Sequence, residues 1–245
     1  MLRYKLRTTI LSLFIIIVMF FPSCSFGAKE PLSEPPSTIN KTSESKKFKK
    51  NIDLTSVAKY EVKYERFYGD NNGENIDIEY PQFVNMPDKI VEDHLNEYLR
   101  YTLLPMKDDK FTIIHGASKI TLSTNDCISG ISQGIGGRPG NPLIGNGAGG
   151  FNYSIKKDRS LSLNDVVKTN DAFFQSLADS TDVLLPDDKK ATNPQYYINK
   201  YIDIEHEQTY GMKYQPFFLT STSIYLIFGS NIEDGDWFAV GVKLN

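Results

Sequence analysis

Histidine and cysteine, the side chains that many metal sites require, are scarce in this chain. Its 245 residues include three histidines and two cysteines: His94, His115, His206, Cys24 and Cys127. No two histidines stand at the spacing that places two ligands on one face of a helix. We therefore expect no metal site. The segment Glu205-His206-Glu207 is more typical of a solvated helix end, and His94 of a core position.

A strong charge of one sign is also lacking. The chain has 27 Lys and Arg against 30 Asp and Glu, a formal net charge of −3 and a pI near 5.7. Proteins that bind nucleic acids concentrate Lys and Arg on the folded domain to contact phosphates. We therefore exclude nucleic acid as a partner.

Motifs for nucleotide binding are absent from the sequence. No Gly-Lys-Ser/Thr occurs, and the glycines of 145–150 precede an expected strand and not a helix. The spacing Gly-x-Ser-x-Gly occurs at Gly130–Gly134, but no helix is expected directly after it. No nucleophile, base or metal cluster can be assembled, so we expect a protein that is not an enzyme and binds no cofactor. Paired carboxylates of the glycosidase type have no fixed spacing, which leaves a wall-modifying hydrolase as an alternative.

The amino-terminal residues have the layout of a secretory signal. Basic residues precede the apolar run Ile10–Phe21, and small or turn-forming residues follow it. A permanent span needs about 20 apolar residues, a length approached only by counting from Thr8 to Phe26. We predict a signal peptide over 1–23, with an uncleaved anchor as the alternative.

Cys24 follows the apolar run directly after a small residue. The segment Phe21-Pro22-Ser23-Cys24 resembles the site at which a bacterial lipoprotein signal is cut and its cysteine acylated. Acyl chains on Cys24 would tether the protein to the outside of the cell membrane. The alternative is cleavage after Phe26 or Gly27. Either way Cys127 remains alone, so we expect no internal disulfide and a buried, inert thiol.

Residues 24–52 are rich in Pro, Ser, Lys and Glu and poor in apolar side chains. Such a segment cannot bury enough surface to offset the entropy of ordering, so we predict a disordered linker. The lysines of 46–50 could contact anionic lipids or wall polymers, although a solvated spacer is the favoured interpretation.

The remaining residues, 53–245, are enough for one domain or two packed lobes. Apolar and polar residues alternate in Val57–Tyr68 and again in Ile76–Tyr80, which predicts a hairpin with a long polar loop. We expect Pro81 to restrict further pairing. Apolar residues at helical spacing predict a helix from Met86 to Leu104, capped by Asn85 and packed on a sheet.

Glycine is concentrated in Ile128–Gly150, where nine glycines occur. That density predicts a loop with positive-φ positions. We expect strands before it, at Phe111–Ile114 and Ser118–Ser123, and after it, at Phe151–Ile155.

The carboxyl-terminal half mixes strand and helix patterns. A short strand is expected at Leu161–Leu163, and helices are expected after Asn164 or Asn170 and from Pro194 to Glu207. The final stretches 216–228 and 237–244 predict an antiparallel pair. The fold class is therefore α+β: antiparallel sheets with helices packed on one face. We expect two intimately packed lobes, at about 53–128 and 129–245.

The order of these elements, from Asp53 to Asn245, resembles a family of extracytoplasmic domains. The family includes the sensor domain of lysozyme-responsive anti-sigma factors and the amino-terminal region of some peptidoglycan deacetylases. The clearest match runs from Tyr153-Ser154-Ile155 to Leu161–Val167, where the family has a strand, a polar turn and a Leu-x-Leu-x-Asp-hydrophobic motif opening a helix.

The resemblance implies a surface domain that binds a lysozyme-like protein or cell-wall material. Loops on a rigid scaffold usually carry recognition, so the candidate ligand contacts lie in the glycine-rich loop: Gly136, Gly137, Arg138, Gly140 and Asn146. The pair Arg138-Pro139 replaces the Ala-His common in the family. No cytoplasmic domain precedes the signal, so we expect that the chain does not itself sequester a sigma factor. A purely structural envelope lipoprotein is a further alternative.

Overall fold

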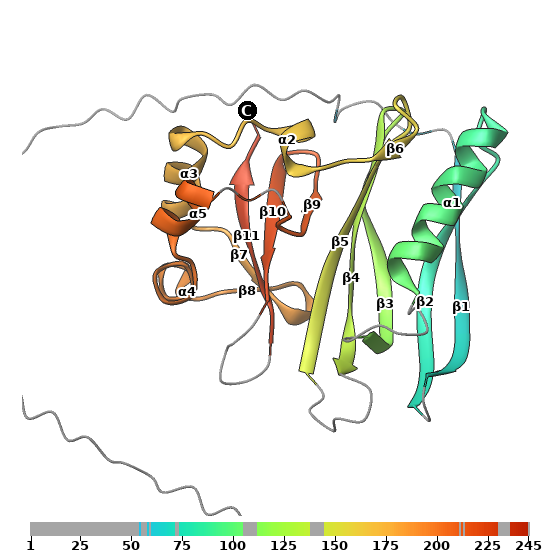
Figure 1. The fold of residues 1–245 in the computed structure, drawn as a ribbon, viewed down its shortest axis with the longest axis horizontal. Helices are drawn as coiled ribbons and strands as arrows, with labels where there is room; N and C mark the ends of the chain where they lie inside the picture. Colours follow the sequence, from blue (N-terminus) through green and yellow to red (C-terminus); the bar gives the residue numbers. More distant parts are fainter. Residues whose placement is uncertain are drawn as a thin grey trace, which may run out of the picture. The chain divides into compact units, whose positions relative to one another are not determined.

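The structure is a computed structural model that describes residues 54, 58, 60–71, 74–104, 112–137, 145–210, 212, 214–229 and 236–244 (Figure 1). All of them belong to the second of two compact units, Glu44–Asn245. The predicted signal peptide, Cys24 and the linker 24–52 lie outside the described residues. Within these residues, no helix has the length and apolar character needed to cross a membrane.

The first sheet has six strands in the order β1-β2-β3-β4-β5-β6. Neighbouring strands are antiparallel except for the β2–β3 pair, which is parallel. The strands are β1 Glu61–Asn71, β2 Glu74–Val84, β3 Thr112–Ser123, β4 Cys127–Gly137, β5 Gly145–Ser154 and β6 Arg159–Ser160. Helix α1, Lys89–Leu103, lies against this sheet (Figure 1).

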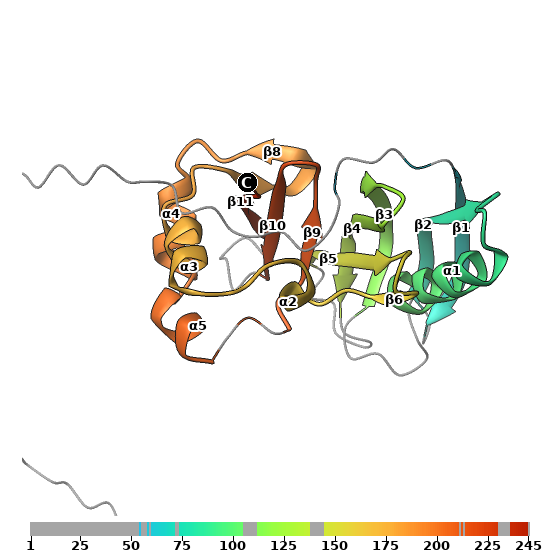
Figure 2. The ribbon, with the colours of Figure 1, turned by 90° about the horizontal axis from the view of Figure 1, so that it is seen from above.

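The second sheet has five strands in the order β8-β7-β11-β10-β9, and all its pairs are antiparallel. Its strands are β7 Val183–Leu185, β8 Lys189–Lys190, β9 Phe217–Leu219, β10 Ser223–Phe228 and β11 Phe238–Lys243. The helices that follow the first sheet are α2 Leu163–Val166, α3 Asp171–Ala178, α4 Pro194–Tyr201 and α5 Ile204–Tyr210. Figure 2 shows α3, α4 and α5 together beside this sheet.

Alternation along β10 separates the two faces of the second sheet. Ile224 and Leu226 belong to the cluster that includes the buried side chains of α3, whereas Tyr225 and Ile227 pack with Ile131 of the first sheet. Helices therefore cover one face, and the first sheet covers the other. The predicted α+β class with helices on one face is confirmed, and Cys127 is fully buried as predicted.

The predicted hairpin and first helix are present, with three corrections. β1 extends to Asn71 and β2 begins at Glu74, so the loop between them is shorter than predicted. β2 then continues through Pro81 to Val84. Pro81 is tolerated because β2 pairs with β3 only from Asp77 to Glu79, which leaves no ladder for the missing N–H to break. The helix cap is Asp88, whose Oδ1 accepts hydrogen bonds from Ile90 N and Val91 N.

The prediction of a glycine-rich loop over Ile128–Gly150 is wrong. Two paired strands occupy its described residues, from Cys127 opposite Ser154 to Gly136 opposite Gly145. Gly130 and Gly150 serve close packing instead of a turn. A β-carbon at Gly130 would overlap the Phe151 ring, and one at Gly150 would overlap the Phe217 carbonyl group of β9.

The predicted lobe boundary at 128/129 is also wrong, because β4 and β5 pair into the first sheet and that sheet extends to Ser160. The division between the sheets therefore falls between β6 and β7. The predicted helix from Pro194 to Glu207 is two helices that meet around Ile202.

Buried polar side chains join the two sheets. Ser129 Oγ accepts a hydrogen bond from Leu219 N (2.7 Å) and donates to Asn152 Oδ1 (2.6 Å). Asn152 Nδ2 donates to the Phe217 carbonyl oxygen (2.7 Å), and Thr121 Oγ1 donates to that of Leu219 (2.6 Å). The backbone edge of β9 is thus satisfied by side chains of the first sheet.

Substitutions of the adjacent residues Gly149 and Gly150 test this packing. We expect Gly150→Ala to lower the free energy of unfolding by about 1–3 kcal/mol, because the new methyl group would collide with the Phe217 backbone. Gly149→Ala is the matched control, since a β-carbon there meets no atom within 4 Å, and its effect should stay within about 0.5 kcal/mol. Urea unfolding measures both, and equal effects would contradict the packing role of Gly150.

Candidate functional site

The predicted ligand contacts do not form an exposed loop among the described residues. Gly136 and Gly137 end β4, and Gly136 pairs with Gly145. Asn146 lies in β5 and donates a hydrogen bond from Nδ2 to Asp236 Oδ1, which joins β5 to the residues before β11. Arg138 and Gly140 lie outside the described residues.

His94 is exposed, so the prediction that it is a core residue is wrong. Its Nδ1 lies 2.7 Å from Asp158 Oδ2, and the Tyr153 hydroxyl donates to Asp158 Oδ1 (2.6 Å). Asp158 adopts a positive φ of 49° in the turn between β5 and β6. The three side chains therefore tie α1 to this turn.

Each of the three groups titrates away from its ordinary range. The contact with Asp158 raises the pKa of His94. Hydrogen bonds from Tyr153 and His94 lower the pKa of Asp158, and burial raises the pKa of Tyr153, aided by the Asp158 carboxylate. Tyr153 thus remains a proton donor to Asp158 at neutral pH, which suits a structural tie.

The Leu-x-Leu-x-Asp motif also has a structural role. Arg159 binds both carboxylate oxygens of Asp165 (2.6 and 3.0 Å), and Asp165 accepts from the Ser162 backbone N–H (2.9 Å). The Arg159 contact lowers the pKa of Asp165. The short strand predicted at Leu161–Leu163 is not present; both leucines are buried, and Leu163 is the first residue of α2. The motif therefore caps α2 and anchors it to the core.

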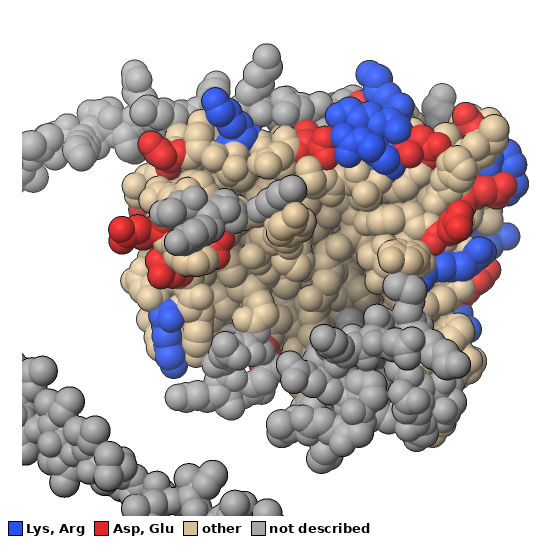
Figure 3. Space-filling model, in the orientation of Figure 1, with Lys and Arg blue, Asp and Glu red and all other residues tan. Residues whose placement is uncertain are grey.

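A small pocket lies where α1 and β5 meet the segment that leads into β9; we call it the junction pocket. Its volume is about 180 Å³, and its lining residues are uncharged: Tyr98, Gly150, Asn152, Leu161, Ser162, Leu163, Tyr214, Gln215, Pro216 and Phe217. In the view of Figure 3, charged side chains gather toward the periphery and the middle of the face is largely uncharged.

Two tyrosines, one largely buried and one exposed, line the junction pocket. Tyr98 Oη accepts a hydrogen bond from Asn152 N (3.1 Å), and burial raises the pKa of Tyr98. Tyr214 is 86% exposed, the largest exposed fraction among the large hydrophobic side chains described. Neither was predicted as a site residue, because Tyr98 belongs to the apolar stripe of its helix and Tyr214 follows no motif.

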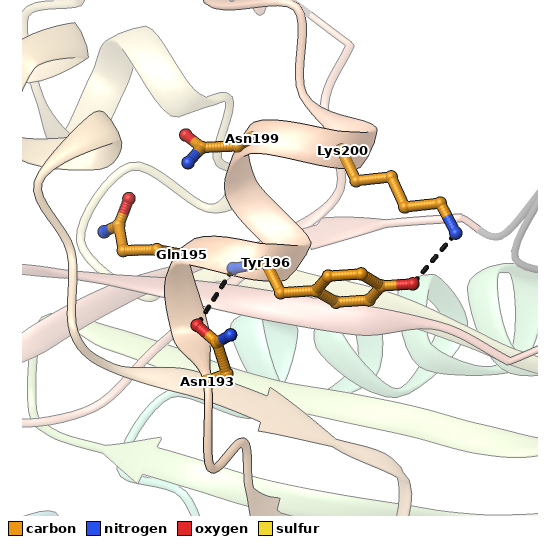
Figure 4. Close-up of a pocket in the computed structure, with 5 residues that line it drawn as sticks. All are labelled: Asn193, Gln195, Tyr196, Asn199 and Lys200. Atoms are coloured by element: carbon orange, nitrogen blue, oxygen red, sulfur yellow. Dashed lines mark hydrogen bonds between the residues drawn. The ribbon is translucent and has the colours of Figure 1, made fainter.

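A second, shallower hollow of about 430 Å³ lies on α4, lined by Asn193, Gln195, Tyr196, Asn199 and Lys200 (Figure 4). Asn193 caps the helix by accepting from Tyr196 N, and Gln195 donates to the carbonyl oxygens of Ala178 and Ser180. Lys200 donates to Tyr196 Oη (2.9 Å), a contact that raises the pKa of Lys200. The hollow therefore offers one cation beside a ring.

The described residues hold no group of three or more His, Cys, Asp or Glu side chains arranged to bind a metal ion. The shifted carboxylates Asp158 and Asp165 are each already engaged by neighbouring donors. Their arrangement therefore supports structure more directly than proton transfer.

The His94 contact predicts a pH-dependent stability. A histidine whose pKa is raised in the folded state stabilises it fully below the unfolded pKa, about 6.5, and the effect is lost as pH rises through the folded pKa. Asp158 remains ionised throughout this range because its pKa is lowered. We expect His94→Gln to lower the melting temperature more at pH 5.5 than at pH 8.5. Equal effects of His94→Gln at both pH values would contradict the ion pair.

Comparisons with known proteins give a distant structural match. No family model matches the chain, and no curated protein matches it. Among solved structures, a member of the DUF3298 family from Bacteroides fragilis is 12% identical, with a TM-score of 0.48. The match covers 77% of this chain and 92% of that one.

Proposed function

We propose that this chain is an extracytoplasmic binding module, tethered to the membrane through acylated Cys24 and the linker 24–52, that recognises a cell-wall glycan at the junction pocket. The export signal and the resemblance to extracytoplasmic sensor domains support the compartment. The chemistry of the pocket supports the ligand class. The module binds without turnover.

The exposed ring of Tyr214 beside an uncharged pocket carries this proposal. A tyrosine offers a flat apolar face with a polar tip, which suits the carbon face of a sugar ring. Gln215 donates an N–H to the Ile227 carbonyl oxygen, and Ser162 donates to Asp165. The side-chain oxygens of Gln215 and Ser162 can accept further hydrogen bonds, as sugar hydroxyl and acetamido N–H groups require. Because no charged residue lines the pocket, a neutral sugar fits better than a phosphate or a peptide carboxylate.

The size of the junction pocket favours one unit of a polymer. Its 180 Å³ is below the roughly 300–1,000 Å³ of sites that enclose a drug-sized ligand. A single sugar ring or its substituent would occupy the pocket, and the rest of the chain would lie on the surface around it. The position at the junction of two sheets is also one at which ligand sites commonly occur.

Replacing Tyr214 tests the pocket. We expect Tyr214→Ala to weaken binding of N-acetylated wall oligosaccharides at least about tenfold, because stacking on an aromatic ring supplies much of the contact area in a shallow site. The melting temperature should not change, since the ring is 86% exposed. Tyr101→Ala, at a position 67% exposed on α1, is the matched control. Calorimetric titration of the full chain in detergent measures the affinities.

Three outcomes would contradict the proposal. Equal affinities of the parent and Tyr214→Ala would remove the junction pocket as the site. Binding of lysozyme without any binding of oligosaccharide would identify a protein ligand instead, as the family resemblance implies. Release of labelled sugar from peptidoglycan would show a hydrolase.

The membrane tether has its own test. We expect Cys24→Ser to release the chain from the membrane fraction, because the acyl chains that hold it there can no longer be attached. Ser25→Ala should leave the chain in the membrane. Cell fractionation, with mass measurement of the amino-terminal peptide, separates the alternatives. An intact amino terminus with an unmodified Cys24 on the parent chain would identify an uncleaved anchor.

A further inference from the structure

The outer edge of β1 is a long strand edge without a neighbour among the described residues. β1 is the outermost strand in the order of the first sheet, at the right of Figure 1. Its 11 residues pair with β2 in an unbroken register from Glu61 to Asn71. Such an edge presents unpaired N–H and C=O groups and is suited to pairing with another strand.

Contacts of β2 show which backbone groups of β1 point outward. The N–H and C=O of Phe83 both bond to the Asn96 side chain (2.8 Å each), so Phe83 does not share its N–H with Val62 opposite it. Antiparallel ladders alternate hydrogen-bonded and non-hydrogen-bonded pairs. Val62, Tyr64 and Arg66 therefore direct their N–H and C=O groups to the outer edge. Pro81, which has no N–H, lies opposite Tyr64 and fits the same alternation.

The charges along β1 are complementary to those of a second copy. Lys63 and Glu65 lie two residues apart, so they share one face of the strand, and both are exposed. Charged residues on an edge commonly keep other strands away. If Lys63 and Glu65 had the same charge, two copies of this edge would repel each other. Because their charges are opposite and they flank Tyr64, an antiparallel second copy can place its Glu65 beside Lys63.

We propose that β1 pairs antiparallel with β1 of a second copy of this chain, around a two-fold axis at Tyr64. In this register Lys63 lies opposite Glu65 of the partner subunit, and the symmetry repeats the contact. Tyr64 lies opposite Tyr64 of the partner subunit in a hydrogen-bonded pair. Lys63 and the partner's Glu65 form a non-hydrogen-bonded pair, whose Cα atoms lie only about 4.5 Å apart, so their side chains can meet.

Neighbouring registers are less favourable. An axis at Lys63, Glu65 or Arg66 would place two like charges directly opposite each other, which destabilises a strand pair. A shift of the pairing by one residue would place residues whose N–H and C=O groups point to the outer edge opposite residues whose groups point to β2, so the ladder could not form.

An axis at Val62 would oppose Glu61 and Lys63, but β1 begins at Glu61, so only Glu61–Lys63 of the strand would pair. An axis at Tyr68 would oppose Asp70 to Arg66, which is already bound to Asp77. The Tyr64 axis opposes unlike charges and leaves Arg66 bound to Asp77 (2.6 and 2.8 Å). The resulting contact is closed, because each copy uses the same edge.

Cysteine cross-linking in cells that express the full chain tests the register. Tyr64→Cys places two thiols beside the proposed axis, and a short bismaleimide should convert the chain to covalent dimers. Tyr68→Cys is the matched control on the same strand, since two copies of residue 68 would lie roughly 26 Å apart at 3.3 Å per residue. The parent chain gives the background from Cys24 and Cys127. Equal cross-linking at both positions, or none at Tyr64→Cys, would overturn the proposal.

Charge reversal tests the ion pairs. In the Tyr64→Cys chain, Lys63→Glu or Glu65→Lys alone should reduce the dimer yield about tenfold, because each opposes like charges twice. The double reversal restores opposite signs and should recover the yield to within about twofold. Melting temperatures of the variants separate loss of folding from loss of pairing. A double variant that stays as weak as the single ones, with unchanged melting temperature, would refute the two-fold register.

Discussion

The close approach of β9 to β5 is the constraint on which the rest of the described structure depends. Gly150 leaves room for the Phe217 carbonyl group, and Ser129 and Asn152 supply hydrogen bonds to the backbone of β9. A buried backbone group without a partner costs about 1–3 kcal/mol. The two polar side chains therefore let β9 be buried against another sheet without a continuous ladder. Ile131 of β4 also packs with apolar side chains of the second sheet.

The same approach shapes the candidate site. Gly150, Asn152 and Phe217 take part in the contact between the sheets and also line the junction pocket. This part of the pocket therefore owes its form to buried packing. Tyr98 of α1 also lines the pocket, and its hydroxyl accepts a hydrogen bond from Asn152 N. A ligand that fills the pocket would contact both sheets, and its binding to the folded state alone would stabilise their packing.

Local patterns predicted the elements whose residues depend on near neighbours. The apolar stripe of α1 and the alternation in β1 were enough to place that helix and that strand. The glycines of β4 and β5 misled because glycine density has two causes, turn geometry and close packing. The contacts of Gly130 with Phe151 and of Gly150 with Phe217, 67 residues further along the chain, distinguish them here. The junction pocket could not be predicted for the same reason, since Tyr98, Asn152 and Tyr214 carry no shared motif and meet only after folding.

A pocket that holds one sugar ring binds weakly by itself, because few contacts must offset the loss of translational freedom. A glycan strand repeats the same unit, so its affinity for the protein rises when two pockets engage it together. Pairing through β1 would supply two pockets at a fixed separation, and the second contact would then form at a high effective concentration. A tether through the predicted linker 24–52 would add reach without fixing direction. Weak single sites, paired copies and such a tether would together suit recognition of a polymer better than recognition of one small molecule.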